Sequence, residues 1–512
     1  MSLQLDMNPL RQGLAREKVI DPCIVVVFGG TGDLAHKKLL PALFHLHRGG
    51  LLPRAFAIVA YASGTMSDDE YRESIRVSIA KAAPYLATDG KVWDEFAALM
   101  RFCPRLEDMR KSLSGLKDML ESLNGQIGAE GNYLFYFAIP PSTFMATAEG
   151  LGEVGLAGQE SGGGWRRLVI EKPFGTDLQS ARELNRELQK VFREDQIYRI
   201  DHYLGKETVQ NILVFRFANQ FVEPVLNANY VDSVQITVAE SIGVGTRGAF
   251  YDSTGALKDI VQNHVLQILS LVCMEPPVSL DADAVRDEKL KVFSSIRHID
   301  PREVDQYTVR GQYSSGMLLG ERVKAYSEED RVASGSATET FVAAKFYVDN
   351  WRWSGVPFYV RTGKRMAKRV TEVAIQLKPI PRVLFGETYR EEISPNIMAL
   401  NLQPDEGIAI LFEAKVPGLG YRIQPVKMDF RYGEAFGATA PDAYERLVMD
   451  AMLGDASLFS RADAVEATWG VVQPILDGWQ QQSSAYAYLP GSWGPAEADE
   501  FIRRDGREWR RL

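Results

Sequence analysis

The chain has 512 residues, a length that predicts two to four domains at roughly 100 to 200 residues per domain. Hydrophobic residues make up 46% and charged residues 24%, which is typical of folded soluble proteins and excludes collagen-like and disordered chains. The 58 Lys and Arg against 67 Asp and Glu give a formal net charge of −9, which argues against a general affinity for nucleic acid or anionic membranes. An anionic ligand therefore needs a local basic site.

The cysteines and the N-terminal residues indicate the compartment. Cys23, Cys103 and Cys273 show no Cys-x-x-Cys spacing, so we expect neither a disulfide framework nor a cysteine zinc site. Residues 1–20 form a polar leader without the apolar core of a signal peptide, and no later segment approaches the roughly 20 apolar residues that cross a bilayer. We therefore expect a cytoplasmic protein with no membrane partner.

The first predicted unit of structure is a strand, a tight turn and a helix. Residues 23–28 (CIVVVF) form a continuous apolar run, typical of a strand buried on both faces of a parallel sheet. A glycine-rich turn over 29–35 follows. Next come leucines at helical spacing and a glycine stop signal: Leu39, Leu40, Leu43, Leu46 and Gly49-Gly50.

Strands and helices then alternate as far as residue 200. Further strands are predicted at 55–60, 133–139 and 167–170, and helices at 68–83 and 111–123. This alternation over 21–200 predicts an α/β, Rossmann-like doubly wound coenzyme domain, with its ligand at the carboxyl ends of the strands.

The rest of the chain, 201–512, has a different pattern. Its strand-like runs are not regularly interleaved with helices, which predicts a larger α+β domain with a mainly antiparallel sheet. Its clearest helix is predicted at 255–274, with one apolar stripe. The predicted strands are 233–239, 341–348, 357–361, 373–377 and 408–412.

The glycine turn is the first candidate site. Gly30-x-Gly32-x-x-Ala35, preceded by Gly29, lets the backbone approach a pyrophosphate at the start of a helix, although an ordinary βα turn has the same composition. An acid after the second strand usually indicates NAD and a basic residue indicates NADP. Residues 61–65 (YASGT) contain neither. Thr31, Ser63 and Thr65 offer hydrogen bonds to a phosphate, and the coenzyme choice stays open.

A second candidate is the block at 199–207 (RIDHYLGKE). His202, Tyr203 and Lys206 supply a ring donor, a hydroxyl and an ammonium, a set suited to a phosphate dianion. A solvated turn is the structural alternative.

A third candidate is His264, which lies on an otherwise apolar helix. It is a general base if a carboxylate orients it, and a core residue otherwise.

Two further segments combine basic residues with turn signals. Lys172, in the run 171–175 (EKPFG), follows a predicted strand at the edge where ligands bind. Thr176 and Gln179 fit a capping box for the next helix, and the bond before Pro173 is expected to be trans from residue type alone. The segment 361–369 (RTGKRMAKR) is either a binding loop or a solvated basic loop. The sequence shows no P-loop, zincin or serine-hydrolase signature, and no metal is expected.

Together these motifs resemble the glucose-6-phosphate dehydrogenase family in order and spacing. The resemblance covers nearly the whole chain after the leader. It rests on 29–35 (GGTGDLA), 171–175 (EKPFG), 199–207 (RIDHYLGKE), 262–264 (QNH), 361–364 (RTGK), 441–447 (PDAYERL) and 494–498 (GPAEA).

The resemblance implies oxidation of the C1 hydroxyl of glucose 6-phosphate to 6-phosphogluconolactone with NADP or NAD, as in the oxidative pentose phosphate pathway or related glucose catabolism. His264 is then the catalytic base and Asp201 the carboxylate that orients it. The implied substrate residues are Lys38, Lys172, His202, Tyr203, Lys206, Glu240, Asp259, Lys364, Arg369 and Gln403. The implied coenzyme residues are Gly29, Gly30, Thr31, Gly32, Asp33, Leu34, Ser63, Pro140 and Lys172.

The family further implies a cis bond before Pro173 and a homodimer or homotetramer built through the large sheet. Two positions depart from its pattern. Ser63 stands where many relatives carry an arginine that pairs with the 2′-phosphate of NADP, and His36 stands where a lysine is common. Two alternatives remain: an NAD(P)-dependent dehydrogenase of another sugar, which the 202–206 cluster argues against, and a non-catalytic coenzyme-sensing protein, which the retained Asp201 and His264 argue against.

Overall fold

The computed structural model describes residues 19–82, 90–158, 163–318, 320–381, 393–419, 422–437, 442–481 and 485–512. The chain forms two compact units. Unit 1 comprises Met1–Glu207, Pro277–Asp287 and Pro441–Glu466, and unit 2 comprises Thr208–Pro276, Glu288–Ala440 and Ala467–Leu512. Most of the predicted leader, residues 1–18, lies outside the described residues.

Unit 1 is built on a seven-stranded sheet that is parallel except at β17. Its strands, in sheet order, are β17 (Phe459–Ser460), β6 (Ile197–Ile200), β5 (Arg166–Ile170), β4 (Tyr133–Phe137), β1 (Cys23–Phe28), β2 (Phe56–Ser63) and β3 (Met100–Arg105). All six residues of β1 are buried, as expected for an apolar run between two layers. The strand order reverses between β1 and β4, which creates a switch point at their carboxyl ends.

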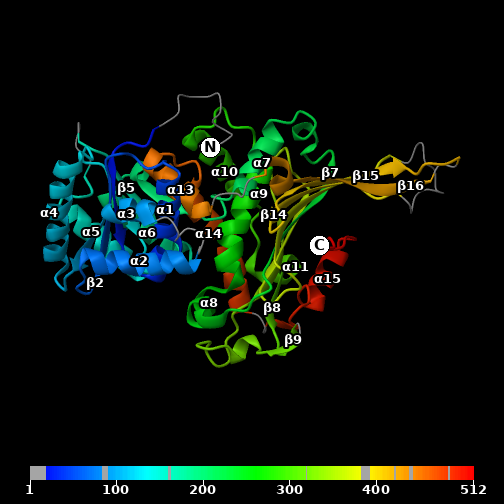
Figure 1. Ribbon diagram of the computed structural model, residues 1–512. Helices are drawn as coiled ribbons and strands as arrows, with labels where there is room; N and C mark the ends of the chain where they lie inside the picture. The colour runs from blue at the N-terminus through cyan, green and yellow to red at the C-terminus, as the bar shows by residue number, and fades with distance from the viewer. Residues whose placement is uncertain are drawn as a thin grey trace. The chain divides into compact units, whose positions relative to one another are not determined.

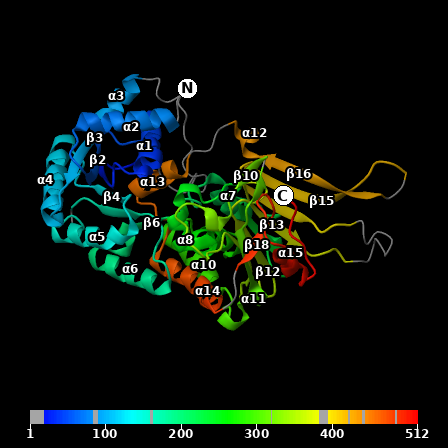
Figure 2. The same cartoon turned by 90° about the horizontal axis from the view of Figure 1, so that it is seen from below.

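Two groups of helices cover this sheet, one on each side of the strands (Figure 2). The first group packs around α1 and the second forms a row. The first contains α1 (Leu40–Arg48), α2 (Asp68–Ala82), α3 (Gly90–Ala98) and α13 (Ala443–Leu453), and the second contains α4 (Met109–Ile127), α5 (Phe144–Glu153) and α6 (Leu178–Val191). The predicted doubly wound Rossmann-like fold is confirmed.

A late segment of the chain completes unit 1. β17 pairs antiparallel with β6, and α13 packs on α1. The compact units are therefore discontinuous in sequence. The predicted domain boundary near residue 200 stays a prediction, and it takes no account of the segments 277–287 and 441–466.

Unit 2 is built on a nine-stranded sheet. In sheet order the strands are β16 (Ile423–Arg431), β15 (Gly407–Lys415), β14 (Ile397–Gln403), β13 (Val370–Leu377), β7 (Val231–Ala239), β12 (Pro357–Gly363), β11 (Phe341–Tyr347), β8 (Thr308–Tyr313) and β18 (Tyr486–Tyr488). The pairs β12–β7 and β18–β8 are parallel and the others antiparallel, which confirms the predicted sheet type. β15 and β16 form a long hairpin at one edge (Figure 1).

The remaining elements connect or flank the sheets. They are α7 (Glu207–Phe217), α8 (Gly248–Ala256), α9 (Leu266–Cys273), α10 (Ala282–Ser295), α11 (Val304–Tyr307), α12 (Tyr432–Phe436), α14 (Ala462–Gln480), α15 (Ala496–Arg503) and the strand pair β9 (Gly316–Leu318) and β10 (Glu321–Val323). Within the described ranges, no helix has both the length and the apolar character needed to span a membrane.

Two local predictions need correction. The helix predicted at 255–274 is present from Leu257 to Cys273, but its first part, Leu257–Val265, is a π-helix that continues into α9, and a kink at Gly255 (φ +69°) precedes it. The cap of α6 lies one residue later than predicted. Asp177 accepts a hydrogen bond from the Ser180 backbone N–H at 2.7 Å, so Asp177 and Ser180 form the capping box in place of Thr176 and Gln179.

Candidate active site

The glycine turn of unit 1 lies directly after β1, at the switch point of the sheet. Gly29 has φ +79°, and its N–H donates to the Tyr61 carbonyl of β2 at 2.8 Å. A Cβ on Gly29 would lie 2.4 Å from the Ala138 carbonyl oxygen, and one on Gly30 would lie 2.6 Å from the Ala60 Cβ. The turn is therefore held against both neighbouring strands, and only glycine fits it.

After the turn, the chain enters a π-helix (Ala35–Leu39) and then α1. Thr31 is exposed. Asp33 is exposed and pairs with Lys37 at 2.8 Å, so the Lys37 ammonium lowers the pKa of the Asp33 carboxyl. The backbone at the start of this helix suits a phosphate, because its first N–H groups have no partner within the helix. These residues fit the pyrophosphate of a dinucleotide coenzyme.

Ser63 is the last residue of β2, and its side chain is exposed. Its partner in the parallel register of β3 is Arg105, which is also exposed. Sequence reasoning missed Arg105, because nothing near it in the sequence marks it. Only the pairing of β2 with β3 reveals that a basic residue lies beside Ser63.

Lys172 follows β5 at the carboxyl edge of the same sheet. The Lys172–Pro173 bond is cis, as the family resemblance implied and against the expectation from residue type. The adjacent Glu171 carboxylate accepts a hydrogen bond from the Tyr136 hydroxyl at 2.6 Å. Burial raises the pKa of Glu171, and hydrogen bonds from Tyr136 and Tyr444 oppose that rise. The sequence analysis gave no role to Tyr136, and it included Tyr444 only as part of the motif 441–447.

The block after β6 forms a compact turn in unit 1. Asp201 is buried, and its Oδ1 accepts a hydrogen bond from the Tyr203 N–H at 2.9 Å. The Lys206 ammonium lies 3.9 Å from the centre of the Tyr203 ring. The centres of the His202 and Tyr203 rings are 5.2 Å apart. The structure therefore brings the three predicted phosphate ligands of this block together.

The start of α13 contacts two other parts of unit 1. A Cβ on Gly205 would lie 2.7 Å from the Ala443 carbonyl oxygen, so the 199–207 block packs directly on this helix. Lys38 pairs with Asp442, the N-cap of α13, at 3.0 Å. Asp442 and Ala443 thus contact both Lys38 and the 199–207 block. Pro140 follows β4 and is exposed.

In unit 2, the π-helix carries Asp259 and His264. In an α-helix two residues five apart point roughly 140° away from each other. A π-helix, whose hydrogen bonds join residues five apart, brings such side chains toward one face. His264 is 1% exposed and Asp259 is partly exposed. The π-helix therefore gives these predicted site residues a common direction that the α-helix predicted from the sequence lacks.

Glu339 fixes the start of this π-helix. Its backbone carbonyl accepts a hydrogen bond from the Ala256 N–H at 3.0 Å, and its Oε1 accepts one from the Leu257 N–H at 2.9 Å. The carboxylate lies against Gly255, where a Cβ would approach it to 2.3 Å. The kink and the start of the π-helix therefore contact a residue about 80 positions away in the sequence, which sequence reasoning missed.

Other predicted substrate residues of unit 2 lie in pairs. Lys364 is buried, forms an ion pair with Glu240, and lies 5.4 Å from the centre of the Tyr251 ring. Arg369 donates a hydrogen bond to Gln403 Oε1 at 3.4 Å. The structure therefore brings Glu240 to Lys364 and Arg369 to Gln403.

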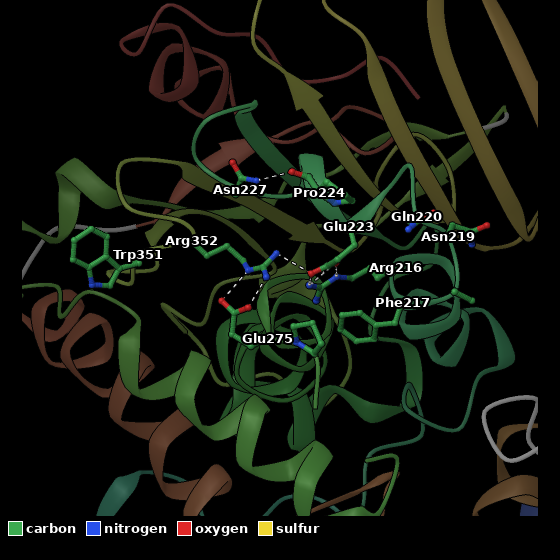
Figure 3. Close-up of a pocket in the computed structure, with 12 residues that line it drawn as sticks. Arg216, Phe217, Asn219, Gln220, Glu223, Pro224, Asn227, Glu275, Trp351 and Arg352 are labelled. Carbon is green, nitrogen blue, oxygen red and sulfur yellow. Dashed lines mark hydrogen bonds and ion pairs between the residues drawn. The ribbon is translucent and has the colours of Figure 1, made fainter. Parts of the chain in front are cut away.

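A separate hollow of about 890 Å³ opens in unit 2 around Arg216 and Arg352 (Figure 3). Arg216 donates to Glu223 and to the carbonyls of Leu271 and Met274, and Arg352 pairs with Glu223 and Glu275. Carboxylates thus neutralise both guanidinium groups, which makes the hollow a poor site for a phosphate. Among the described residues that line it, none is a predicted site residue.

A switch-point glycine turn that fits a pyrophosphate, followed by a basic cluster after β6, defines a dinucleotide-dependent oxidoreductase. Family models identify the branch of this class. Residues 26–211 match "Glucose-6-phosphate dehydrogenase, NAD binding domain", and residues 213–510 match "Glucose-6-phosphate dehydrogenase, C-terminal domain". The chain belongs to the glucose-6-phosphate dehydrogenase family.

Relatives and solved structures agree with this assignment. The chain is 45% identical to "Glucose-6-phosphate 1-dehydrogenase 2" of Mycobacterium tuberculosis over 508 residues, 98% of both chains. It is 42% identical to "Glucose-6-phosphate 1-dehydrogenase" of Bacillus subtilis, over 95% of this chain and 98% of that one. A structure of "Glucose-6-phosphate dehydrogenase in complex with its substrate glucose-6-phosphate" is similar with a TM-score of 0.89 at 34% identity, covering 97% of this chain and all (100%) of that one.

Proposed function

We propose that this protein oxidises the C1 hydroxyl of glucose 6-phosphate to 6-phosphogluconolactone and transfers the hydride to a nicotinamide coenzyme. The observation that carries this proposal is the cluster of His202, Tyr203 and Lys206 beside the buried Asp201. The cluster supplies the donors that a sugar phosphate needs, in a chain that belongs to the family over its whole length. The reaction would serve the oxidative pentose phosphate pathway or related glucose catabolism.

The proposed chemistry uses two residues for the proton. His264 takes the proton of the C1 hydroxyl on an imidazole nitrogen, and the Asp201 carboxylate orients the ring and stabilises its charged form. As the proton leaves, electron density on oxygen forms the carbonyl and releases the C1 hydride. A bound nicotinamide coenzyme supplies the acceptor for that hydride. Glu240 and Asp259 are proposed to hold sugar hydroxyls. Lys364, Gln403 and Arg369 are proposed to make weaker contacts with the substrate.

The direct test is the initial rate of glucose 6-phosphate oxidation with NADP and with NAD, each titrated separately and followed by nicotinamide absorbance. We expect a rate with glucose 6-phosphate and a far smaller one with unphosphorylated glucose, because the His202, Tyr203 and Lys206 contacts orient the sugar for hydride transfer. Equal rates with the two sugars would favour a dehydrogenase of another sugar. The absence of a rate with either coenzyme would reject the proposed activity.

Replacing Lys206 by alanine is expected to raise the KM for glucose 6-phosphate at least about tenfold, because a hydrogen bond to a charged group contributes roughly 1.5–3 kcal/mol. The KM for the coenzyme should stay within about twofold. Steady-state kinetics with each substrate varied separately measures both values. Lys190→Ala, which removes an exposed lysine of α6, is the matched control and should change neither KM. An unchanged KM for the sugar phosphate in Lys206→Ala would contradict the assigned phosphate site.

We also propose a homodimer or homotetramer built through the sheet of unit 2. Its edge strand β16 presents Val426, Met428 and Phe430 at alternate positions, and they are 39%, 60% and 37% exposed. An edge strand with exposed apolar side chains is suited to pair with a second copy.

A cytoplasmic location is proposed because Cys23, Cys103 and Cys273 are all free thiols, which is usual in a reducing compartment.

A further inference from the structure

The carboxyl ends of β2 and β3 form a corner of the unit 1 sheet that holds an unassigned cation. Ser63 ends β2, Arg105 ends β3, and the two residues are partners in the parallel register. Both side chains are exposed. The Arg105 guanidinium is also close enough to Tyr61 of β2 to oppose the rise that burial causes in the pKa of that phenol. The register therefore places Arg105 on the same face of the sheet as Ser63, at its carboxyl edge.

Arg105 is available for a ligand. Across the ranges that the structure describes, its side chain takes part in no hydrogen bond and no ion pair. Arg101 of the same strand, by contrast, donates to the Ala98 and Met100 carbonyls and lies 3.6 Å from Asp68. Asp108, three residues after Arg105, is engaged elsewhere, because its side chain caps α4 by accepting a hydrogen bond from the Lys111 N–H at 3.0 Å.

This corner is where a dinucleotide fold places the adenosine ribose. The pyrophosphate lies at the first βα turn and the ribose 2′ position lies at the end of the second strand. In this protein the glycine turn is hydrogen-bonded to the end of β2, because the Gly29 N–H donates to the carbonyl of Tyr61, two residues before Ser63. A ribose with its pyrophosphate on the glycine turn would therefore present its 2′ group to Ser63 and Arg105.

We propose that Arg105 binds the 2′-phosphate of NADP and gives this protein a preference for NADP over NAD. The proposal rests on the proposed use of a nicotinamide dinucleotide and assigns its specificity to one residue. A guanidinium group can hold two phosphate oxygens at once, and the Ser63 hydroxyl adds a neutral donor. The cation on β3 thus takes the role that an arginine at position 63 would have.

The test measures binding of adenosine fragments to the full-length protein by isothermal titration calorimetry. The probes are 2′,5′-ADP, which carries the 2′-phosphate, and 5′-AMP, which lacks it. We expect the wild-type protein to bind 2′,5′-ADP at least about tenfold more tightly, and Arg105→Ala to remove most of this difference while 5′-AMP affinity changes less than about twofold. The ratio of kcat/KM for NADP to that for NAD should fall by a similar factor.

Two further variants separate a local contact from a general charge effect. Arg54→Ala removes an exposed arginine that precedes β2, at the opposite end of that strand, and should leave the fragment affinities unchanged. Adding Ser63→Arg to the Arg105→Ala variant should restore 2′,5′-ADP binding, because it returns one cation to the same corner. Losses that are equal in Arg54→Ala and Arg105→Ala would overturn the proposal.

Failure of this inference is distinguishable from failure of the proposed function. If the wild-type protein binds both fragments equally, or if Arg105→Ala keeps the preference for 2′,5′-ADP, Arg105 is not the specificity residue, even when glucose 6-phosphate is oxidised. If no oxidation occurs but the fragment affinities respond as expected, the assignment of Arg105 holds and the proposed reaction does not.

Discussion

Replacing His264 by asparagine is expected to lower kcat for glucose 6-phosphate oxidation about a thousandfold, within the range for loss of a general base. Asparagine keeps a polar side chain of similar size at this buried position but takes up no proton near neutral pH. The affinity for coenzyme should stay within about twofold, because the glycine turn belongs to unit 1 and His264 to unit 2. Steady-state rates and a coenzyme titration of the same sample measure the two effects.

His298→Asn is the matched control, since it makes the same substitution at an exposed site of the described chain. It should leave both the rate and the coenzyme affinity unchanged. A His264→Asn variant with a normal rate would remove the proposed base. A wild-type protein that binds coenzyme without any turnover would instead favour the coenzyme-sensing alternative, and the variant would then have no rate to lose.

The Rossmann-like sheet is the part of the fold that the sequence predicts best. The apolar run 23–28 is buried on both faces, and the predicted strand matches β1 at both ends. Such a strand can be predicted from its own residues, because a continuous apolar run is suited to burial on both faces whichever helices cover it. The 202–206 cluster is also local, because its members lie in one turn and close together in the structure.

Features that depend on distant residues were not predictable. The apolar stripe of 255–274 suggests an ordinary helix, whereas the structure has a kink and a π-helix whose start contacts the distant Glu339. The return of β17 to β6 joins residues about 260 positions apart, and local patterns give no sign of it. The position of Arg105 beside Ser63 likewise follows only from the register of β3 with β2. In each case the deciding partner comes from another element of the fold.

Replacing Gly29 by alanine is expected to weaken coenzyme binding at least about tenfold and to destabilise the protein by about 2–4 kcal/mol. The positive φ of +79° alone costs a residue with a Cβ roughly 1–2 kcal/mol. The new Cβ would also lie 2.4 Å from the Ala138 carbonyl oxygen, a backbone atom fixed by its place after β4. The turn must then move away from the pyrophosphate position, which calorimetry with coenzyme and a thermal unfolding curve will record.

Gly50 provides the matched control for this change. It has a similar φ of +68°, but a Cβ there meets no atom within 4 Å. Gly50→Ala should therefore show only the conformational cost of roughly 1–2 kcal/mol and normal coenzyme affinity. Equal coenzyme affinities in the Gly29→Ala and Gly50→Ala proteins would mean that the close approach of Gly29 to Ala138 does not shape the coenzyme site. A selective loss in Gly29→Ala would tie coenzyme binding to the backbone contact between the glycine turn and the residue that follows β4.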